Sequence, residues 1–213
     1  MKKVILSLSF LVASLAVFSQ SEKYIAAMQK NITELDGAMQ KGNFPELANN
    51  FERIGDAEKT QWLPYYWAGL ALSTAGWVDQ KADKDVLAGR INALCDKADA
   101  LTTDNADKAE ILVLRNMAAT QQMLVDPQAR YITYGQQAAG FLQKGITLNA
   151  NNPRLYYLQG MSLFNTPEQF GGGKAKAKPV LEKAVSLFKT EPVKPLYPQW
   201  GDKEAINTLA QCQ

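Results

Sequence analysis

Apolar residues recur at helical spacing along almost the whole chain. Ile25, Met28, Ile32, Leu35 and Met39 follow one another at steps of three or four residues, which places their side chains on one face of an α-helix. The same steps return in three further stretches: Leu47, Phe51 and Ile54; Ile91, Leu94, Cys95 and Ala98; and Val180, Leu181, Ala184 and Leu187. Turn-forming residues separate these stretches, and no run alternates in the manner of a β-strand. The pattern predicts an all-α protein of paired helices joined by short turns.

The chain also contains internally similar segments. If Gly69 stands at the eighth position of a helix-turn-helix unit, a step back of about 34 residues reaches Leu35 at the same point of an earlier helix. In that earlier unit Gly42 falls in the turn, and Phe44 follows it. A junction of the same kind runs from Asn149 to Gly160, where an Asn-Asn-Pro linker leads into an aromatic pair and a glycine. We therefore predict stacked helical hairpins.

These segments resemble the tetratricopeptide repeat, in an exported bacterial form, from about Tyr24 to about Leu187. The resemblance implies an α-α superhelix of helical hairpins with a C-terminal capping helix. The expected organisation is a signal peptide over 1–19, a repeat domain over 20–190, and a proline-rich segment with a capping helix over 191–213. In the last part we expect a helix from Asp202 to Ala210, capped by Asp202. The spacing between Ala98 and Gly145 exceeds the repeat period, which leaves the number of repeats open.

The resemblance also implies a binding site. In this family the first helix of each pair lines a concave face on which partners bind. Carried onto the matching positions of this chain, the groove residues are Tyr66, Leu70, Thr74, Glu110, Met117, Arg154, Tyr157, Met161, Phe164 and Asn165. Tyrosine, arginine and methionine are common anchors of protein interfaces. Tyr65 and Tyr156 fall at helix-packing positions, so we expect them to be structural.

Residues 1–19 predict export. Lys2 and Lys3 precede an uncharged, mostly apolar stretch from Val4 to Phe18, and Ser19 is small enough for a cleavage site. The run is shorter than the ~20 apolar residues of a spanning helix, so we expect cleavage rather than a retained anchor. The mature protein is then periplasmic or secreted, without a membrane span.

Composition narrows the function further. The sequence holds 23 basic and 21 acidic residues, so loss of Lys2 and Lys3 leaves a balanced charge, which argues against nucleic acid as the partner. It contains no histidine, which excludes histidine-based catalytic sets and metal sites. We expect no enzymatic activity, no metal and no cofactor. Cys95 and Cys212 either form a disulfide or remain a buried thiol and an exposed, frayed one.

A glycine-rich loop precedes the last long helix. Its Gly171 to Lys174 run lacks the preceding strand and the Ser/Thr ending of a phosphate-binding loop. We interpret it as a hinge that opens a helix at Lys174, with Phe170 filling the space beneath. The loop from Asn165 to Gly173 is also a candidate binding element, because long ordered loops are often functional.

Two hypotheses for function follow. The first is a non-enzymatic scaffold that binds a peptide or protein of the cell envelope in its concave groove. The alternative is a periplasmic receptor or transport accessory for a small molecule, which an enclosed apolar pocket lined by Tyr157, Met161 and Phe164 would favour. An open groove would favour the scaffold.

Overall fold

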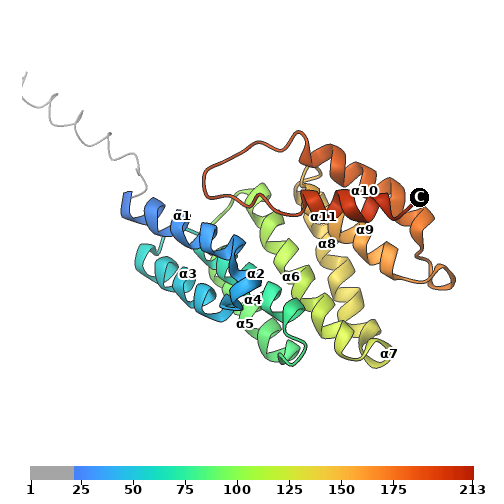
Figure 1. Cartoon of the computed structure of the whole chain (residues 1–213), viewed down its shortest axis with the longest axis horizontal. Coiled ribbons are helices and arrows are strands. Elements are labelled where there is room, and N and C mark those ends of the chain that lie inside the picture. The colour runs from blue at the N-terminus through green and yellow to red at the C-terminus, as the bar shows by residue number, and fades with distance from the viewer. Residues whose placement is uncertain (1–21) are drawn as a thin grey trace, which may run out of the picture.

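The computed structural model describes residues 22–213, and every regular element in that range is helical, as predicted (Figure 1). The elements are α1 (Glu22–Asp36), α2 (Ala38–Lys41), α3 (Phe44–Glu58), α4 (Leu63–Val78), α5 (Lys84–Asp99), α6 (Asn105–Val125), α7 (Pro127–Arg130), the π-helix η2 (Tyr131–Gly135), α8 (Gln136–Leu148), α9 (Pro153–Asn165), the 3-10 helix η3 (Glu168–Phe170), α10 (Lys174–Phe188) and α11 (Asp202–Ala210). The predicted signal peptide lies outside the described residues. Within residues 22–213 no helix is long and apolar enough to cross a membrane.

Local sequence explains where several of the helices begin. Asp83, Asp104 and Asn152 each precede a helix, and their side-chain oxygens accept hydrogen bonds from the first free backbone N–H groups. Gly173 opens α10 with a φ of 102°, which confirms the predicted helix start at Lys174. The cap predicted for α11 is wrong. Its N-cap is Gly201 in the left-handed region, and Asp202 lies in the first turn without a capping bond.

Neighbouring helices pack closely through small residues. A methyl group at Gly145 would lie 2.6 Å from the Leu155 side chain, and one at Gly160 would lie 2.6 Å from Leu181. The first contact joins the end of α8 to the start of α9, and the second joins α9 to α10. Gly69 likewise faces Leu114 of α6 at 2.9 Å, so it serves the close packing that its predicted position requires.

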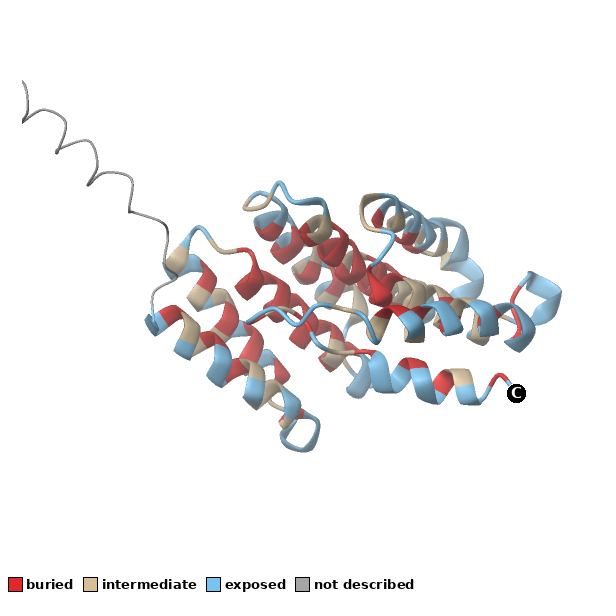
Figure 2. Ribbon diagram, turned by 90° about the horizontal axis from the view of Figure 1, so that it is seen from above, coloured by how far each residue is buried: buried red, intermediate tan, exposed pale blue. Residues whose placement is uncertain are grey.

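The core is centred on helices α4 and α6, which contain the most buried residues. In α4 thirteen residues between Leu63 and Gly76 are buried, so this helix is enclosed on nearly all sides. Figure 2 shows the buried positions concentrated along the middle of the protein, with exposed residues at the flanks. Cys95 is buried in this core and Cys212 in a smaller cluster with Leu181, and both are free thiols. Neither of the two alternatives left open is right in full. The two cysteines form no disulfide, and although Cys95 is a buried thiol as predicted, Cys212 is buried rather than exposed.

Helix α6 contacts both α4 and α9, and hydrogen bonds to Glu110 of α6 join Tyr66 of α4 and Arg154 of α9. We call the face that these three residues mark the α4–α6–α9 wall. The chain does not end at α10. Residues 189–201, the tail segment, leave α10 in an irregular conformation and run back over this wall before α11 begins (Figure 1). The predicted proline-rich segment therefore covers the face on which a partner was expected to bind.

Candidate functional site

The ten residues predicted to bind a partner divide into two equal groups. Five are buried and make contacts inside the protein: Tyr66, Leu70, Glu110, Met117 and Arg154. The others are partly or fully exposed: Thr74, Tyr157, Met161, Phe164 and Asn165. Tyr66 has no exposed surface at all, and Arg154 has 2%. In this structure the buried five are therefore not available to a partner side chain.

An ion pair explains the burial of Glu110 and Arg154. The Arg154 Nε donates to both carboxylate oxygens of Glu110 at 3.0 Å, and its Nη2 donates to Oε1 at 2.8 Å. Asn152 Nδ2 donates to the same Oε1 at 2.7 Å, and the Tyr66 hydroxyl donates to Oε2 at 3.2 Å. On its other side Arg154 is paired with Glu191 of the tail segment. The buried charge of Glu110 is tolerated because Arg154, Asn152 and Tyr66 all donate hydrogen bonds to its carboxylate.

The network changes the titration of its members. Burial raises the pKa of Tyr66 well above its ordinary value, and the negative charge of Glu110 adds to the effect. Burial alone would lower the pKa of Arg154, but the charge and hydrogen bonds of Glu110 and the bond to Glu191 outweigh it, so the pKa is raised. Tyr66 is thus neutral and Arg154 charged across the whole physiological range of pH.

The tail segment is fastened to the wall by specific side chains. Trp67 Nε1 donates to the Leu196 carbonyl at 2.8 Å, and Trp200 Nε1 donates to the Tyr66 hydroxyl at 3.0 Å. The Tyr197 hydroxyl donates to Asp107 Oδ1 at 3.0 Å. Leu196 is buried among the residues of the main core. The tail segment therefore covers the part of the α4–α6–α9 wall around Tyr66, Trp67 and Asp107.

An enclosed apolar pocket lined by Tyr157, Met161 and Phe164 would have favoured the small-molecule alternative, but these three side chains make contacts with other parts of the chain. Tyr157 and Phe164 pack against the cluster that α10 forms with Cys212, and Thr208 of α11 donates to the Met161 sulfur at 3.3 Å. Burial, followed by the charge of Glu204, raises the pKa of Tyr157 to about 12. The C-terminal helix thus covers this part of the wall, as a capping helix would.

A hollow of about 670 Å³ lies instead where α4 ends, α5 begins and α6 ends. It falls within the range of about 300–1,000 Å³ that is usual for small-molecule sites. Ten residues line it: Gly76, Trp77, Gln80, Ala82, Asp83, Lys84, Asp85, Gln121, Leu124 and Val125. We call this hollow the Trp77 pocket.

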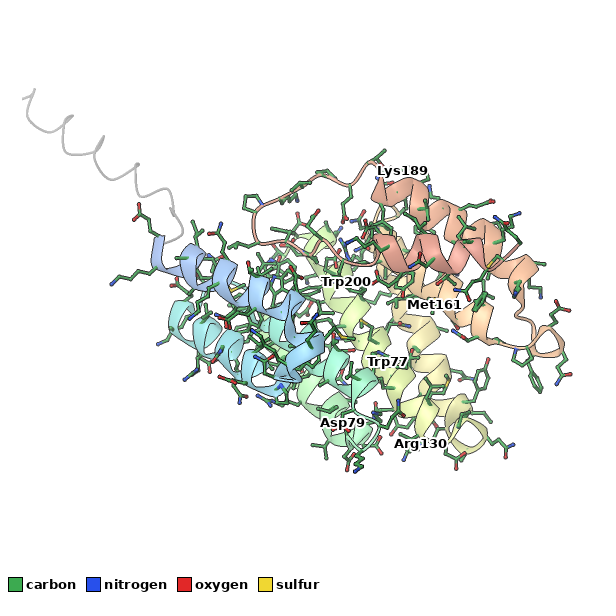
Figure 3. All side chains as sticks on the ribbon, viewed as in Figure 1. Trp77, Asp79, Arg130, Met161, Lys189 and Trp200 are labelled. Carbon is green, nitrogen blue, oxygen red and sulfur yellow. The ribbon has the colours of Figure 1, made fainter. Side chains whose placement is uncertain are left out.

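The Trp77 pocket has an apolar rim that is open to solvent. Trp77 is 43% exposed, and Leu124 and Val125 are exposed at a similar level on the facing helix. Other exposed apolar side chains lie on nearby helices: Val78 at the end of α4, Val86 in the first turn of α5, and Tyr131 and Ile132 in η2. Trp77 and Arg130 lie toward the same end of the molecule, near the turn that holds Asp79 (Figure 3). Exposed apolar groups gathered in this way make the Trp77 pocket a candidate binding site.

The charges around the Trp77 pocket are mostly engaged. Asp85 accepts hydrogen bonds from Gln122 and Arg130, which lower the pKa of its carboxyl. Asp83 is occupied in capping α5. Lys84 donates to the carbonyls of Gly76 and Asp79, which ties the α4–α5 turn together. Lys84 is thus a cation held at the pocket lining beside carboxylates that already have partners.

One buried amide shapes the floor of the Trp77 pocket. Gln121 Nε2 donates to the Ser73 carbonyl at 2.7 Å, which fixes the orientation of the amide, while its Oε1 has no hydrogen-bond partner among residues 22–213. Gly76 has no side chain, and a methyl group there would collide with this oxygen. Gly76 therefore allows α6 to approach α4 closely at the base of the pocket.

The groove residues predicted from the sequence end one helical step before the residues that line the Trp77 pocket. The predicted series Tyr66, Leu70 and Thr74 continues at Trp77, and Met117 continues at Gln121 and Leu124, at the same spacing. The extension was available from the sequence alone. Phe170, which was expected to fill space beneath its loop, is 72% exposed, so that prediction is wrong. No group of acidic or cysteine side chains within residues 22–213 is arranged to hold a metal ion.

Comparison with known proteins gives one informative match. No protein-family model matches the chain, and no curated protein does. The solved structure of the HusA haemophore from Porphyromonas gingivalis is similar, with a TM-score of 0.81 and 34% sequence identity. The match covers 91% of this chain and 94% of that one. With this identity over nearly the full length of both chains, the protein belongs to the same family as the HusA haemophore.

Proposed function

We propose that this protein is an exported, non-enzymatic carrier that binds haem, or a closely related flat tetrapyrrole, in the Trp77 pocket. The proposal follows the small-molecule alternative rather than the scaffold hypothesis. Its main support is the family relationship to a haemophore, together with an open pocket of suitable size that has apolar side chains at its rim and polar ones beside them. In this reading the tetratricopeptide-like hairpins form a frame that presents the pocket, and the wall is not the ligand site.

The lining of the Trp77 pocket suits such a ligand. A tetrapyrrole has two large apolar faces, which aromatic and aliphatic side chains such as Trp77, Leu124 and Val125 can contact. Haem also carries two carboxylates at one edge, and Lys84 provides a positive charge at the lining. Since Asp83 and Asp85 are engaged in hydrogen bonds, they oppose these carboxylates less than free aspartates would.

The composition restricts how an iron atom would be held. The sequence has no histidine, and the lining of the Trp77 pocket contains no cysteine, methionine or tyrosine, the other usual side-chain ligands of haem iron. We therefore propose that the ring is held mainly by apolar contact, so that affinity depends little on the metal. This distinguishes the site from one built on histidine ligation.

The test is a titration of the mature chain with haem and, separately, with metal-free protoporphyrin, followed by visible absorbance. We expect both to bind at one site with affinities within about tenfold of each other. Trp77→Ala and Leu124→Asp should each weaken both ligands by about tenfold or more, because they remove a stacking surface or add a charge to it. Phe170→Ala, which removes an exposed aromatic side chain outside the pocket, is the matched control. Failure of both rings to bind, or binding that neither pocket variant changes, would refute the proposal.

A further inference from the structure

The loop between α9 and α10 presents a large apolar side chain to water. Phe170, at the end of η3, is 72% exposed, and the loop lies at the end of the molecule opposite α1 (Figure 1). The loop itself is tightly built. The N–H groups of Phe170 and Gly172 both donate to the Pro167 carbonyl, at 2.9 and 3.2 Å. A methyl group at Gly172 would collide with the Thr166 carbonyl oxygen, so the loop backbone packs against the end of α9. A backbone of defined conformation therefore holds the Phe170 ring in solvent.

Lysines surround this ring. Lys174, Lys176, Lys178 and Lys183 follow the loop in α10, and all four are exposed. The Lys176 Nζ donates to the Gly171 carbonyl at 3.0 Å, which places its ammonium group beside the loop. Among residues 22–213 none of these four lysines forms an ion pair with a carboxylate. Their charges are therefore available to an external anion.

The lysines are spread over a broad face rather than gathered at one point. Lys174 and Lys178 are one helical turn apart along one edge of the exposed face of α10, and Lys176 and Lys183 lie along the other edge. Such a spread fits an extended array of anions better than a single carboxylate.

The charge of the whole chain is divided in the same sense. Residues 153–213 hold eight basic and five acidic side chains, whereas residues 20–152 hold 13 basic and 16 acidic ones. The balanced total therefore conceals a positive C-terminal part and a negative remainder. In the loop and α10 only Glu168 and Glu182 oppose the four lysines. An anionic surface would attract this end of the molecule and repel the rest, which orients the protein on it.

We propose that the loop of residues 166–173 and the exposed face of α10, together called the Phe170 surface, dock on the surface of an anionic lipid bilayer. The lysine ammonium groups contact lipid phosphates, and the Phe170 ring enters the boundary between headgroups and acyl chains. An acidic protein partner would use the lysines but would leave the projecting ring without a role. The Phe170 surface is separate from the Trp77 pocket, so the inference does not depend on the proposed ligand.

The test is co-flotation of the mature chain with vesicles of equal parts phosphatidylglycerol and phosphatidylcholine, compared with vesicles of phosphatidylcholine alone. We expect binding to the anionic vesicles only, and a loss of binding as ionic strength rises, because salt screens the lysine charges. The variant with Lys174→Gln, Lys176→Gln and Lys178→Gln should bind at least about tenfold more weakly, since each lysine near an anionic surface contributes about fivefold.

A matched variant separates the position of the charges from their number. Lys23→Gln, Lys41→Gln and Lys144→Gln remove the same charge from exposed positions outside the Phe170 surface, and binding should stay within about twofold of wild type. Phe170→Ala should weaken binding to the anionic vesicles by about tenfold, because it removes the apolar group that enters the interface. Circular dichroism checks that each variant keeps its helices.

Three results would overturn the inference. The first is a wild-type chain that does not float with the anionic vesicles. The second is equal binding by the two triple variants. The third is an affinity for soluble polyglutamate that equals the affinity for the vesicles and does not change in Phe170→Ala, since the surface would then serve an acidic protein. Ring binding in the Trp77 pocket is measured without vesicles, so failure of either proposal leaves the other intact.

Discussion

The buried pair of Arg154 and Glu110 should be the most sensitive point of the fold. The change Arg154→Met keeps the length and apolar stem of the side chain and removes the guanidinium. Glu110 then keeps only the hydrogen bonds from Asn152 and Tyr66, with no positive charge nearby. Glu191 loses the partner that fastens the tail segment to the wall.

The magnitude follows from the burial of the two side chains. Arg154 is 2% exposed and Glu110 7%, so a solvent shell cannot replace the lost partner. Removal of one member of such a pair costs about 3–5 kcal/mol. For a chain of this size each kcal/mol lowers the melting temperature by about 2–4 °C. The expected fall is therefore roughly 6–20 °C.

Urea unfolding followed by circular dichroism measures the loss, with a double variant to assign its cause. In Arg154→Met with Glu110→Met the buried carboxylate at position 110 is removed and only the more exposed Glu191 is left unpaired, so we expect the double variant to be more stable than Arg154→Met alone by about 1–3 kcal/mol. Arg115→Met, which breaks the exposed pair with Asp96, should cost no more than about 1 kcal/mol. The reasoning fails if Arg154→Met costs no more than Arg115→Met, or if the double variant is the least stable.

Further predictions concern packing, capping and titration. Gly160→Ala should cost about 1–3 kcal/mol in urea unfolding, because the added methyl group meets Leu181. Asp104→Ala should cost about 1 kcal/mol in the same assay by removing the cap of α6. Burial and a neighbouring carboxylate raise the pKa of Tyr197 to about 12, above its unfolded value. Its contribution to stability is therefore complete below pH ~10 and lost as pH rises toward 12, and ultraviolet absorbance should show late tyrosinate formation together with unfolding. Burial raises the pKa of the Cys95 thiol to about 12, so a thiol reagent should label it only after denaturation.

The helical architecture was predictable because its signals are local. Periodic apolar residues, the Asn152-Pro153 start and small residues such as Gly69 and Gly160 act within one or two turns of helix. The same local reading failed at Asp202, since the preceding Gly201 adopts the left-handed conformation that begins the helix. Either Gly201 or Asp202 could stand at the N-cap of this helix, and the local sequence alone does not decide between them.

The occupation of the wall was not predictable from local patterns. Trp200 meets Tyr66 across 134 positions of sequence, and Leu196 meets Trp67 across 129. No periodicity links residues so far apart, although the buried charge of Arg154 required some partner. The Trp77 pocket is an intermediate case. Trp77, Gln121 and Leu124 in its lining continue the predicted series of groove residues. The hollow itself, however, depends on how closely α6 approaches α4 at Gly76.

The four tryptophans sit in unlike surroundings, and this has a spectroscopic consequence. Trp62 and Trp67 are buried and Trp200 is half-buried, whereas Trp77 is open to water. Acrylamide should therefore quench the emission in two phases, with the red-shifted fraction belonging to Trp77. The blue-shifted remainder reports on the interior and on Trp200. A single emission spectrum thus separates events in the pocket from events at the tail without any added label.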